Sequence, residues 1–312
     1  MAFLSWSVRR LQSRIMKHRT LGKTGLKVSV IGIGTWQFGG EWGKTFTPAE
    51  ATAMLSRAKE LGVNLIDTAE CYGDHLSESL IGQAIKGQRK DWIIATKFGH
   101  RFTGFMKRSD ERDIPDVREQ LDASLRALRT DYIDVYQYHS VRDNEFDNPT
   151  LWDFLQKAKK QGKIRHIGNS ISNGLDLSVQ TDKSTAAGVE VLQLVYNRLE
   201  RKAEEQSFTS AMKQELGVLA RVPLASGYLS GKYKPGAKFS DKEYRGTLEA
   251  DKVDEKLKEV EKIAKLELPP GVDMAQWALA WCLKHPAVTA VIPGVKSVEQ
   301  VEKNAKAAEL VA

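Results

Sequence analysis

Short apolar segments that alternate with amphipathic helical stretches constrain the fold of this 312-residue chain more than any other feature. In the helical stretches, apolar residues recur about every 3.6 residues, so that Met54, Leu55, Ala58 and Leu61 share one face of the first. This alternation is typical of parallel β/α architecture. The candidate strands are residues 29–34, 64–68, 92–97, 132–138, 164–168, 190–195, 217–222 and 288–292.

Eight strand–helix units in about 290 residues match the α/β class, specifically a (β/α)8 TIM barrel, in both length and number. A doubly wound sheet is the alternative, but Gly32-Ile33-Gly34 lacks the third glycine of the Gly-x-Gly-x-x-Gly turn. Two extended pieces around Gly22–Gly25 predict an N-terminal β-hairpin. Residues 98–113 and 225–250 follow strands and predict long loops at the C-terminal face of the barrel.

Two helix starts carry capping boxes. Thr47 and Glu50, with Pro48 between them, predict the start of the first helix. Ser297 and Gln300 predict the start of the last one. A helix N-terminus of this kind is also a natural phosphate site.

The formal net charge of +7 owes most to the N-terminal tail, because residues 1–19 hold five basic side chains and no acidic one. Without those five, 42 basic residues face 40 acidic ones, a net of +2, so we expect no nucleic-acid partner. The tail has the composition of an organelle transit peptide, but we favour a leader upstream of a start at Met16. We therefore expect residues 1–15 to be a disordered leader and residues 16–312 to form a single barrel domain.

No apolar run approaches the roughly 20 residues that a membrane span needs, so we expect no membrane partner. Cys71 and Cys282 imply no disulfide framework and fit a reducing compartment. These features favour a cytoplasmic protein, and we expect a monomer or a weak homo-oligomer.

Three apolar segments end in, or just before, an ionisable residue. The first reaches Asp67, with Tyr72 five residues further on, the second reaches Lys97, and the third reaches His139. Burying such groups is costly unless they are paired. The carboxyl ends of parallel strands meet at one face of a barrel, where active sites lie. We therefore expect these four side chains to meet.

Their chemistry is that of a proton donor. An ammonium group stabilises a phenolate and lowers a tyrosine pKa from its ordinary value of about 10, and a carboxylate keeps the lysine charged. A neutral histidine can hold a carbonyl oxygen, so the set predicts a general acid that protonates a developing alkoxide. Carbonyl reduction also needs a hydride, which points to a nicotinamide cofactor. Each residue alone has an ordinary structural explanation, but their joint placement favours catalysis.

These motifs resemble those of the aldo-keto reductase family. Residues 65–73 are similar to the family signature around its catalytic aspartate and tyrosine, residues 95–97 to its lysine motif and residues 138–140 to its histidine motif. The resemblance runs from about Met16 to the C-terminus. It implies a (β/α)8 barrel, NADPH-dependent reduction of aldehydes and ketones, and catalytic roles for Asp67, Tyr72, Lys97 and His139.

The resemblance also implies a cofactor site. Gln193 resembles the glutamine that binds the carboxamide, and Tyr196 the aromatic residue that stacks on the nicotinamide. Residues 223–232 resemble the loop over the pyrophosphate, and residues 292–304 the site of the adenosine 2′-phosphate, where Lys296 favours NADP(H) over NAD(H). The implied cofactor-binding residues are Gly34, Thr35, Trp36, Asp67, Asn169, Ser170, Gln193, Tyr196, Pro223, Leu224, Ser226, Gly227, Leu229, Gly231, Lys232, Gly294, Lys296, Ser297, Gln300 and Asn304.

One departure from the family pattern follows the fifth strand, where Ile171 occupies the place of an asparagine. Ser170 keeps its place, whereas Asn169 stands one residue early and would point the other way on an extended strand. The expected substrate pocket consists of Trp36, Tyr72, Phe98 and His139, with Trp42, Phe102, Phe105 and Tyr228 as further candidates.

The sequence thus predicts an oxidoreductase that transfers a hydride from NADPH to the carbonyl of an aldehyde or ketone, without a metal. Two alternatives stay open. One is a nucleotide-sensing or scaffold barrel without significant turnover, like the barrel subunits of this superfamily that attach to channels. The other is a dehydrogenase that oxidises an alcohol or a sugar with the same residues.

Overall fold

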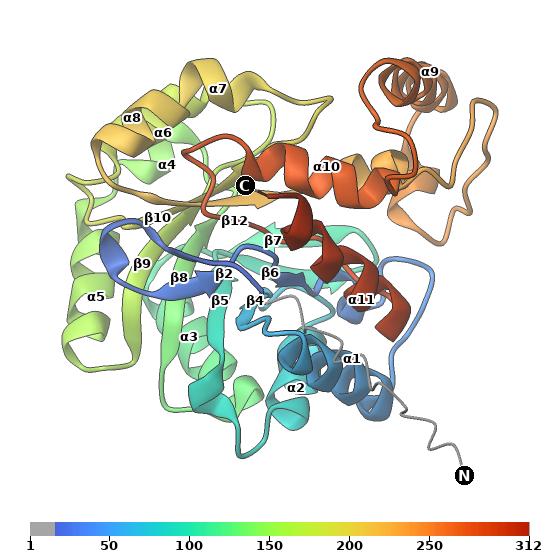
Figure 1. Ribbon diagram of the computed structural model, residues 1–312. Helices are drawn as coiled ribbons and strands as arrows, with labels where there is room; N and C mark the ends of the chain where they lie inside the picture. Colours follow the sequence, from blue (N-terminus) through green and yellow to red (C-terminus); the bar gives the residue numbers. More distant parts are fainter. Residues whose placement is uncertain (1–15, 312) are drawn as a thin grey trace, which may run out of the picture.

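Eight parallel strands form one sheet that closes on itself as a barrel (Figure 1). The structure is a computed structural model that describes residues 16–311, so the expectations for residues 1–15 lie outside the described residues. Parallel bridges from Ile31 to Val291 and from Gly34 to Gly294 join the first strand to the last. In spatial order the strands are β3 (Ile33–Gly34), β4 (Leu65–Asp67), β5 (Ile93–Phe98), β8 (Ile133–His139), β9 (Ile164–Ser170), β10 (Val191–Val195), β11 (Gly217–Arg221) and β12 (Ala290–Val291).

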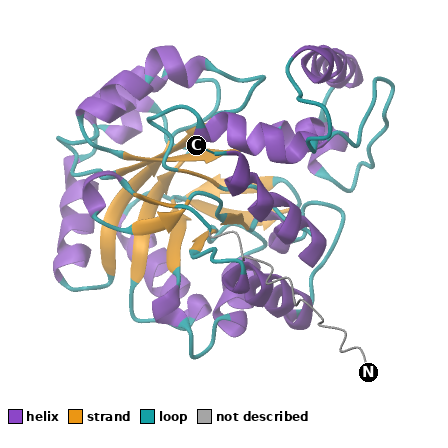
Figure 2. Cartoon of the chain, in the orientation of Figure 1, coloured by secondary structure: helices purple, strands orange, loops and turns teal. Residues whose placement is uncertain are grey.

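Helices surround the strands (Figure 2), which confirms the predicted (β/α)8 fold. The first helix starts as predicted, because the Thr47 side chain accepts from the Glu50 N–H and the Glu50 carboxylate accepts from the Thr47 N–H. The helices are α1 (Pro48–Glu60), α2 (Leu76–Ala84), α3 (Ile114–Leu128), α4 (Asp143–Phe146), α5 (Pro149–Lys160), α6 (Leu177–Lys183), α7 (Lys202–Gln206), α8 (Phe208–Lys213), α9 (Ala250–Leu266), α10 (Met274–Leu283) and α11 (Val298–Lys306). Short 3-10 turns η1 to η6 cover Gly22–Thr24, Trp36–Gly39, Arg89–Asp91, Ala225–Ser230, Tyr244–Thr247 and Ala307–Leu310.

The predicted N-terminal hairpin is confirmed as β1 (His18–Thr20) paired with β2 (Lys27–Ser29). Its Leu21 and Val28 are fully buried and join the apolar cluster that fills the inside of the barrel. The hairpin therefore closes the end of the barrel that lies opposite the carboxyl ends of the strands. The strand residues of this inner cluster are Leu65, Ala95, Val135, Val191, Leu219 and Ala290.

The two long segments at the C-terminal face differ in structure. Residues 98–113 contain an antiparallel hairpin, β6 (His100–Gly104) with β7 (Lys107–Asp110), where the sequence predicted a loop. The hairpin strands carry charged side chains and no apolar alternation, so the sequence gives little strand signal there. Residues 225–250 contain η4 and η5, and η4 packs with α9 and α10 in a separate apolar cluster.

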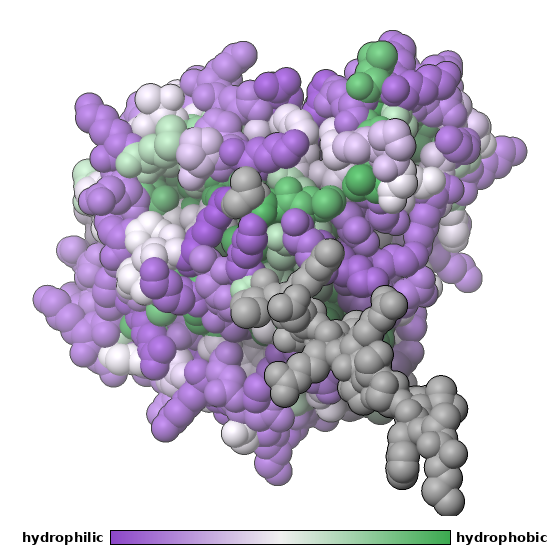
Figure 3. All heavy atoms as spheres, viewed as in Figure 1, coloured by the Kyte–Doolittle hydropathy of each residue, from purple (hydrophilic) through white to green (hydrophobic). Residues whose placement is uncertain are grey.

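The surface is mainly hydrophilic on the face shown in Figure 3. The exposed large apolar side chains among residues 16–311 belong to separate elements, as is normal for a protein surface. They are Phe105, Met212, Leu266 and Leu310. No helix within residues 16–311 combines the length and the apolar character needed to cross a membrane.

Candidate active site

A polar layer lies inside the barrel, just above the apolar cluster. Because side chains alternate along a strand, the residue two positions after each inward apolar residue also points inward. Those positions hold Asp67 after Leu65, Lys97 after Ala95, and Gln137 after Val135. The same step leads to Gln193 on β10 and Arg221 on β11. A step of two residues along each of these strands therefore leads from the apolar cluster to a layer of ionisable and amide side chains inside the barrel.

Lys97 is the centre of this layer. Its Nζ donates to Asp67 Oδ1 at 2.7 Å, to the Thr68 carbonyl oxygen at 2.8 Å and to the Tyr72 hydroxyl oxygen at 3.3 Å. Burial by itself lowers the pKa of Lys97, but Asp67 and Tyr72 reverse this effect and leave that pKa raised. The fully buried ammonium therefore stays charged, and its three protons are directed at three fixed oxygens.

Asp67 is held from both sides. Its Oδ2 accepts from Gln193 Nε2 at 2.6 Å and from Gln137 Nε2 at 3.3 Å, while Oδ1 faces Lys97. Gln193 Nε2 also lies 3.2 Å from Gln137 Oε1. A buried carboxylate with these donors is paired and satisfied, which fixes Lys97 below Tyr72.

Tyr72 follows β4 and borders the cavity. Burial raises the pKa of Tyr72 to about 12, and the Lys97 ammonium opposes this rise. The sequence predicted the lysine effect but not the larger effect of burial. The hydroxyl is therefore protonated at neutral pH, as a proton donor must be.

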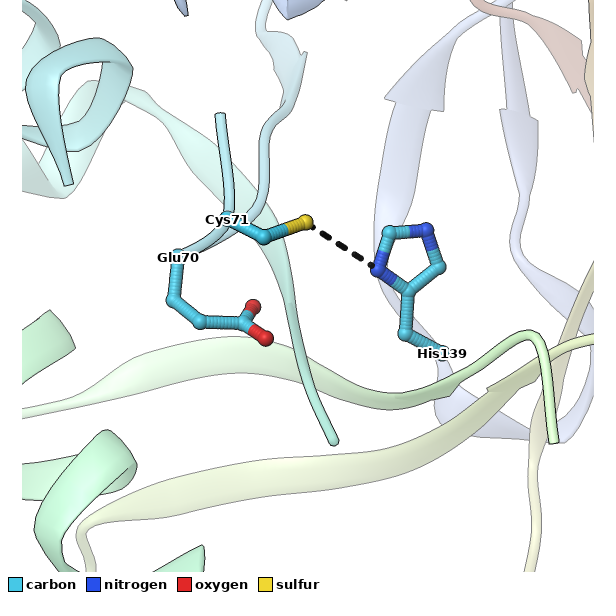
Figure 4. A group of neighbouring side chains, drawn as sticks. All are labelled: Glu70, Cys71 and His139. Carbon is cyan, nitrogen blue, oxygen red and sulfur yellow. Dashed lines mark hydrogen bonds between the residues drawn. The ribbon is translucent and has the colours of Figure 1, made fainter. Parts of the chain in front are cut away.

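His139 ends β8 beside Tyr72, with their ring centroids 6.2 Å apart. Burial, together with the positive charges of Lys97 and Arg221, lowers the pKa of His139 well below its ordinary value, so the imidazole is neutral. Its Nδ1 lies 3.7 Å from Cys71 Sγ, and the other ring nitrogen points away from Cys71 (Figure 4). The structure therefore brings the four predicted residues together in one cluster.

A cavity of about 500 Å³ opens above this cluster, within the range of about 300–1,000 Å³ that is usual for ligand pockets. It runs from the carboxyl ends of the strands past η4 to the start of α11. The predicted site residues that line it are Gly34, Thr35, Trp36, Asp67, Tyr72, His139, Gln193, Pro223, Leu224, Ser226, Gly227, Lys232, Gly294, Lys296, Gln300 and Asn304.

Three predicted residues point to the outer side of the barrel wall instead. Phe98 directly follows the inward Lys97, so strand alternation turns it outward, where its ring stacks 5.0 Å from that of Tyr138. Asn169 Nδ2 donates to Gln180 Oε1 of α6 at 2.8 Å, so its side chain also faces the helices. These placements support neither a substrate contact for Phe98 nor a carboxamide contact for Asn169.

Tyr196 is the third of these residues. Its hydroxyl donates to Glu204 Oε1 of α7 at 2.7 Å, and its ring packs 4.8 Å from Phe208 and 5.3 Å from Trp281. It directly follows β10, where its N–H still donates to the Arg221 carbonyl oxygen at 3.3 Å, and three residues after the inward Gln193 strand alternation turns its side chain outward. This position gives no support to the predicted stacking of Tyr196 on a nicotinamide.

The remaining predicted residues lie next to the cavity without lining it. Ser170 is buried and its Oγ lies 3.4 Å from Gln193 Oε1, so it supports that glutamine. Ser297 caps α11 by accepting from Gln300 N–H, but the Gln300 side chain accepts from Lys296 N–H and does not close the predicted box. Leu229 is fully buried in the cluster of η4, α9 and α10, and Gly231 follows η4.

Several residues that line the cavity were not predicted from the sequence. Arg221 is half-buried and donates to the Ile171 carbonyl oxygen at 3.1 Å, while its Nε has no partner within the described residues. Strand alternation counted from Leu219 would have placed it inside the barrel. Arg108 and Met106, from the unpredicted hairpin, line the cavity as well.

Buried Glu41 joins that hairpin to the turn after β3. It accepts from Trp36 Nε1 at 2.7 Å, from Met106 N–H at 2.7 Å and from the Arg108 guanidinium. These contacts hold Trp36 and the hairpin against each other as one wall of the cavity. In the sequence Glu41 is an isolated acidic residue that belongs to no motif, so its contacts could be found only from the fold.

A strap, residues 239–249, crosses the other side of the cavity. Glu243 forms an antiparallel β-bridge with Trp42, and the Tyr244 ring lies 5.6 Å from the Trp42 ring. Arg245 donates to both carboxylate oxygens of Glu243. Lys296 Nζ donates to the Trp42 carbonyl oxygen at 2.6 Å. The strap therefore packs against Trp42, and its Arg245 lines the cavity.

The shape and charge of this cavity fit a nicotinamide dinucleotide. One end holds the four catalytic candidates, and the other is lined by Lys232, Lys296 and Lys303, which suit phosphate groups. At the η4 wall, Ala225, Ser226 and Gly227 have φ values of 47°, 57° and 93°. Left-handed conformations at non-glycine residues cost about 1–3 kcal/mol each and are typical of ligand-binding loops.

Comparisons with known proteins agree with this geometry. The Aldo/keto reductase family matches residues 30–312. The uncharacterized oxidoreductase YrpG of Bacillus subtilis is 33% identical, with 95% of this chain and 92% of that protein covered, and L-galactose dehydrogenase of Arabidopsis thaliana is 32% identical, with 93% and 87% covered. The holo form of the aldo-keto reductase AKR11C1 from Bacillus halodurans superposes with a TM-score of 0.78 at 31% identity, covering 94% of this chain and 91% of that one. These relatives support an oxidoreductase that reduces carbonyl groups with a nicotinamide cofactor, and the chain belongs to the aldo/keto reductase family.

Proposed function

We propose that this protein reduces aldehydes or ketones with NADPH, with Tyr72 as the general acid. The observation that carries the proposal is the line Asp67–Lys97–Tyr72, at 2.7 and 3.3 Å, which ends at the cavity next to His139. A nicotinamide cofactor supplies the hydride when it is bound. Reduction of a panel of aldehydes and ketones, followed by NADPH absorbance and repeated with NADH, tests the proposal.

The residues of this chain handle the proton and the substrate oxygen. His139 is neutral and lines the cavity, so the ring nitrogen that points away from Cys71 (Figure 4) can donate to the carbonyl oxygen and position it. The Tyr72 hydroxyl transfers its proton to that oxygen as negative charge develops there. The resulting phenolate is stabilised by Lys97, whose own charge is balanced by Asp67. Arg221 adds a further positive charge to the field around Tyr72 and His139.

Lys296 provides a test of the cofactor preference. We expect Lys296→Ala to raise the KM for NADPH about 10- to 100-fold, because a hydrogen bond to a charged group is worth about 1.5–3 kcal/mol. The KM for NADH, which has no 2′-phosphate, is expected to stay nearly the same. Steady-state kinetics with both cofactors measure the ratio. The exposed Lys306 of α11 lies outside the cavity lining and gives a matched control, Lys306→Ala. An unchanged NADPH-to-NADH ratio in Lys296→Ala would contradict the proposal.

The pH profile of reduction tests the proton assignments. His139 must be neutral, and its lowered pKa moves the loss of activity on the acid side below the ordinary histidine value of 6.5. Tyr72 must be protonated, and its pKa of about 12 moves the loss on the alkaline side to higher pH. We therefore expect kcat/KM to be flat around neutral pH. A midpoint near 6.5 that disappears in His139→Gln would show that His139 titrates normally.

The oxidative direction is a second candidate, and it uses the same residues in reverse. It is favoured by the 32% identity to a relative named L-galactose dehydrogenase. Tyr72 would then accept a proton from an alcohol after ionising beside Lys97. Comparison of kcat/KM for alcohol oxidation and carbonyl reduction at one pH decides between the directions.

A further inference from the structure

Three metal-ligand side chains converge behind the catalytic cluster. A carboxylate oxygen of Glu70, the Sγ of Cys71 and a ring nitrogen of His139 all lie within 4.8 Å of one another, and no other such group occurs within residues 16–311. Figure 4 shows the Cys71 thiol directed at His139 Nδ1 and the Glu70 carboxylate extending to the same space. The loop after β4 contributes the first two residues and the end of β8 the third.

Glu70 supplies independent evidence that this space suits a ligand. Its side chain is only 3% exposed, and Oε1 accepts from the His100 N–H at 3.1 Å. Its Oε2 has no hydrogen-bond partner among the described residues. A buried carboxylate oxygen without a partner is costly, and a bound cation would satisfy it.

The donor set and its spacing match zinc. Thiolate, imidazole and carboxylate are the usual ligands of Zn²⁺, with distances of about 2.3 Å to sulfur and about 2.1 Å to nitrogen. Tetrahedral angles between such bonds separate sulfur from nitrogen by about 3.6 Å, and Cys71 Sγ lies 3.7 Å from His139 Nδ1. A Glu70 carboxylate oxygen lies within 4.8 Å of both atoms and provides the third donor.

The local charges also permit a divalent cation. One thiolate and one carboxylate balance the charge of Zn²⁺, so the occupied site carries no net charge, and the protons that they lose pass to solvent. Of the fixed cations that act on His139, Lys97 is paired with Asp67 and Arg108 with Glu41, while Arg221 donates to the Ile171 carbonyl oxygen. A neutral complex therefore avoids most of the cost of a buried charge.

We propose that Glu70, Cys71 and His139 form a Zn²⁺ site on the Nδ1 side of His139. Zinc on Nδ1 keeps the proton on the other ring nitrogen, which points away from Cys71 in Figure 4, and His139 lines the cavity. The ion would hold His139 in the tautomer that donates to a substrate oxygen. This consequence for the substrate rests on the proposed function, whereas zinc binding itself does not.

Titration calorimetry of the full chain with zinc chloride tests the site without any need for turnover. We expect about one Zn²⁺ per chain, and an affinity at least about 100-fold weaker in Cys71→Ala, because loss of an outer-shell partner already costs about 10- to 100-fold. Glu70→Gln keeps an oxygen for the His100 N–H and provides a second variant if Cys71→Ala does not fold. Cys282→Ala is the matched control, since Cys282 is equally buried but contacts the Tyr196 carbonyl oxygen.

Cobalt reports the ligands directly. Co²⁺ added to the wild-type chain is expected to give a thiolate charge-transfer absorbance, which is retained in Cys282→Ala and lost in Cys71→Ala. Wild-type affinity for zinc in both Cys71→Ala and Glu70→Gln, or no binding by the wild-type chain, would overturn the site. A chain that binds zinc in this way but reduces no carbonyl would contradict the proposed function alone.

Discussion

Replacing Tyr72 with phenylalanine is expected to lower kcat for carbonyl reduction by about 10²- to 10⁴-fold, the usual contribution of a general acid. The change removes one hydroxyl group and keeps the ring, which stacks 6.1 Å from Trp36. Lys97 keeps its bonds to Asp67 and to the Thr68 carbonyl oxygen, so the cluster below stays charged and ordered. NADPH binding, measured by fluorescence titration, is expected to stay within about threefold of the wild type, a change of less than about 0.7 kcal/mol in binding free energy, because the phenylalanine ring replaces the tyrosine ring.

Tyr228→Phe is the control for this experiment. Tyr228 is also buried, its hydroxyl has no partner within residues 16–311, and it packs in the cluster of η4, α9 and α10 away from the cavity lining. Its kcat is expected to match that of the wild type. If Tyr72→Phe also turned over at the wild-type rate, the proton would have to come from another group, and the central assignment would be wrong.

The apolar cluster inside the barrel and the polar layer above it were both predictable from the sequence, because both depend on local periodicity. The apolar residue and the ionisable residue two positions later are visible in Leu65-Ile66-Asp67 and in Ala95-Thr96-Lys97, and parallel strands bring their ends together. The same rule identifies Phe98 as an outward residue, so its predicted place in the pocket conflicts with the placement of Lys97. Strand periodicity therefore predicted which side chains face the inside of the barrel better than the presence of aromatic residues near the motifs did.

Contacts between distant segments were beyond the sequence. Glu41 and Arg108 are separated by 67 residues, and nothing in either local sequence indicates that they pair. Lys296 and Trp42 are 254 residues apart, yet they are joined by a hydrogen bond and both line the cavity. The size of the burial effect on Tyr72 likewise depends on all the elements that surround it. Local patterns thus define the polar layer inside the barrel, whereas the walls of the cavity arise only from tertiary packing.

Lys97→Met is expected to impair both stability and turnover, because it leaves the Asp67 carboxylate buried without its cation. Removing one partner of a buried pair costs about 3–5 kcal/mol, and Gln193 and Gln137, which still donate to Asp67, favour the lower end of that range. Urea unfolding measures the free-energy change. The control is Lys183→Met, which breaks a half-exposed pair with Asp147 and is expected to cost about 0–1 kcal/mol.

The double variant Asp67→Asn, Lys97→Met separates the structural role of this pair from its catalytic role. Removing both charges abolishes the unpaired carboxylate, so most of the lost stability is expected to return. Turnover is not expected to return, because Tyr72 loses the ammonium 3.3 Å from its hydroxyl, which is the main charge that opposes the effect of burial on its pKa of about 12. If kcat recovered together with stability, Lys97 would serve only to neutralise Asp67. A stable but inactive double variant would instead assign Lys97 to the stabilisation of the Tyr72 phenolate.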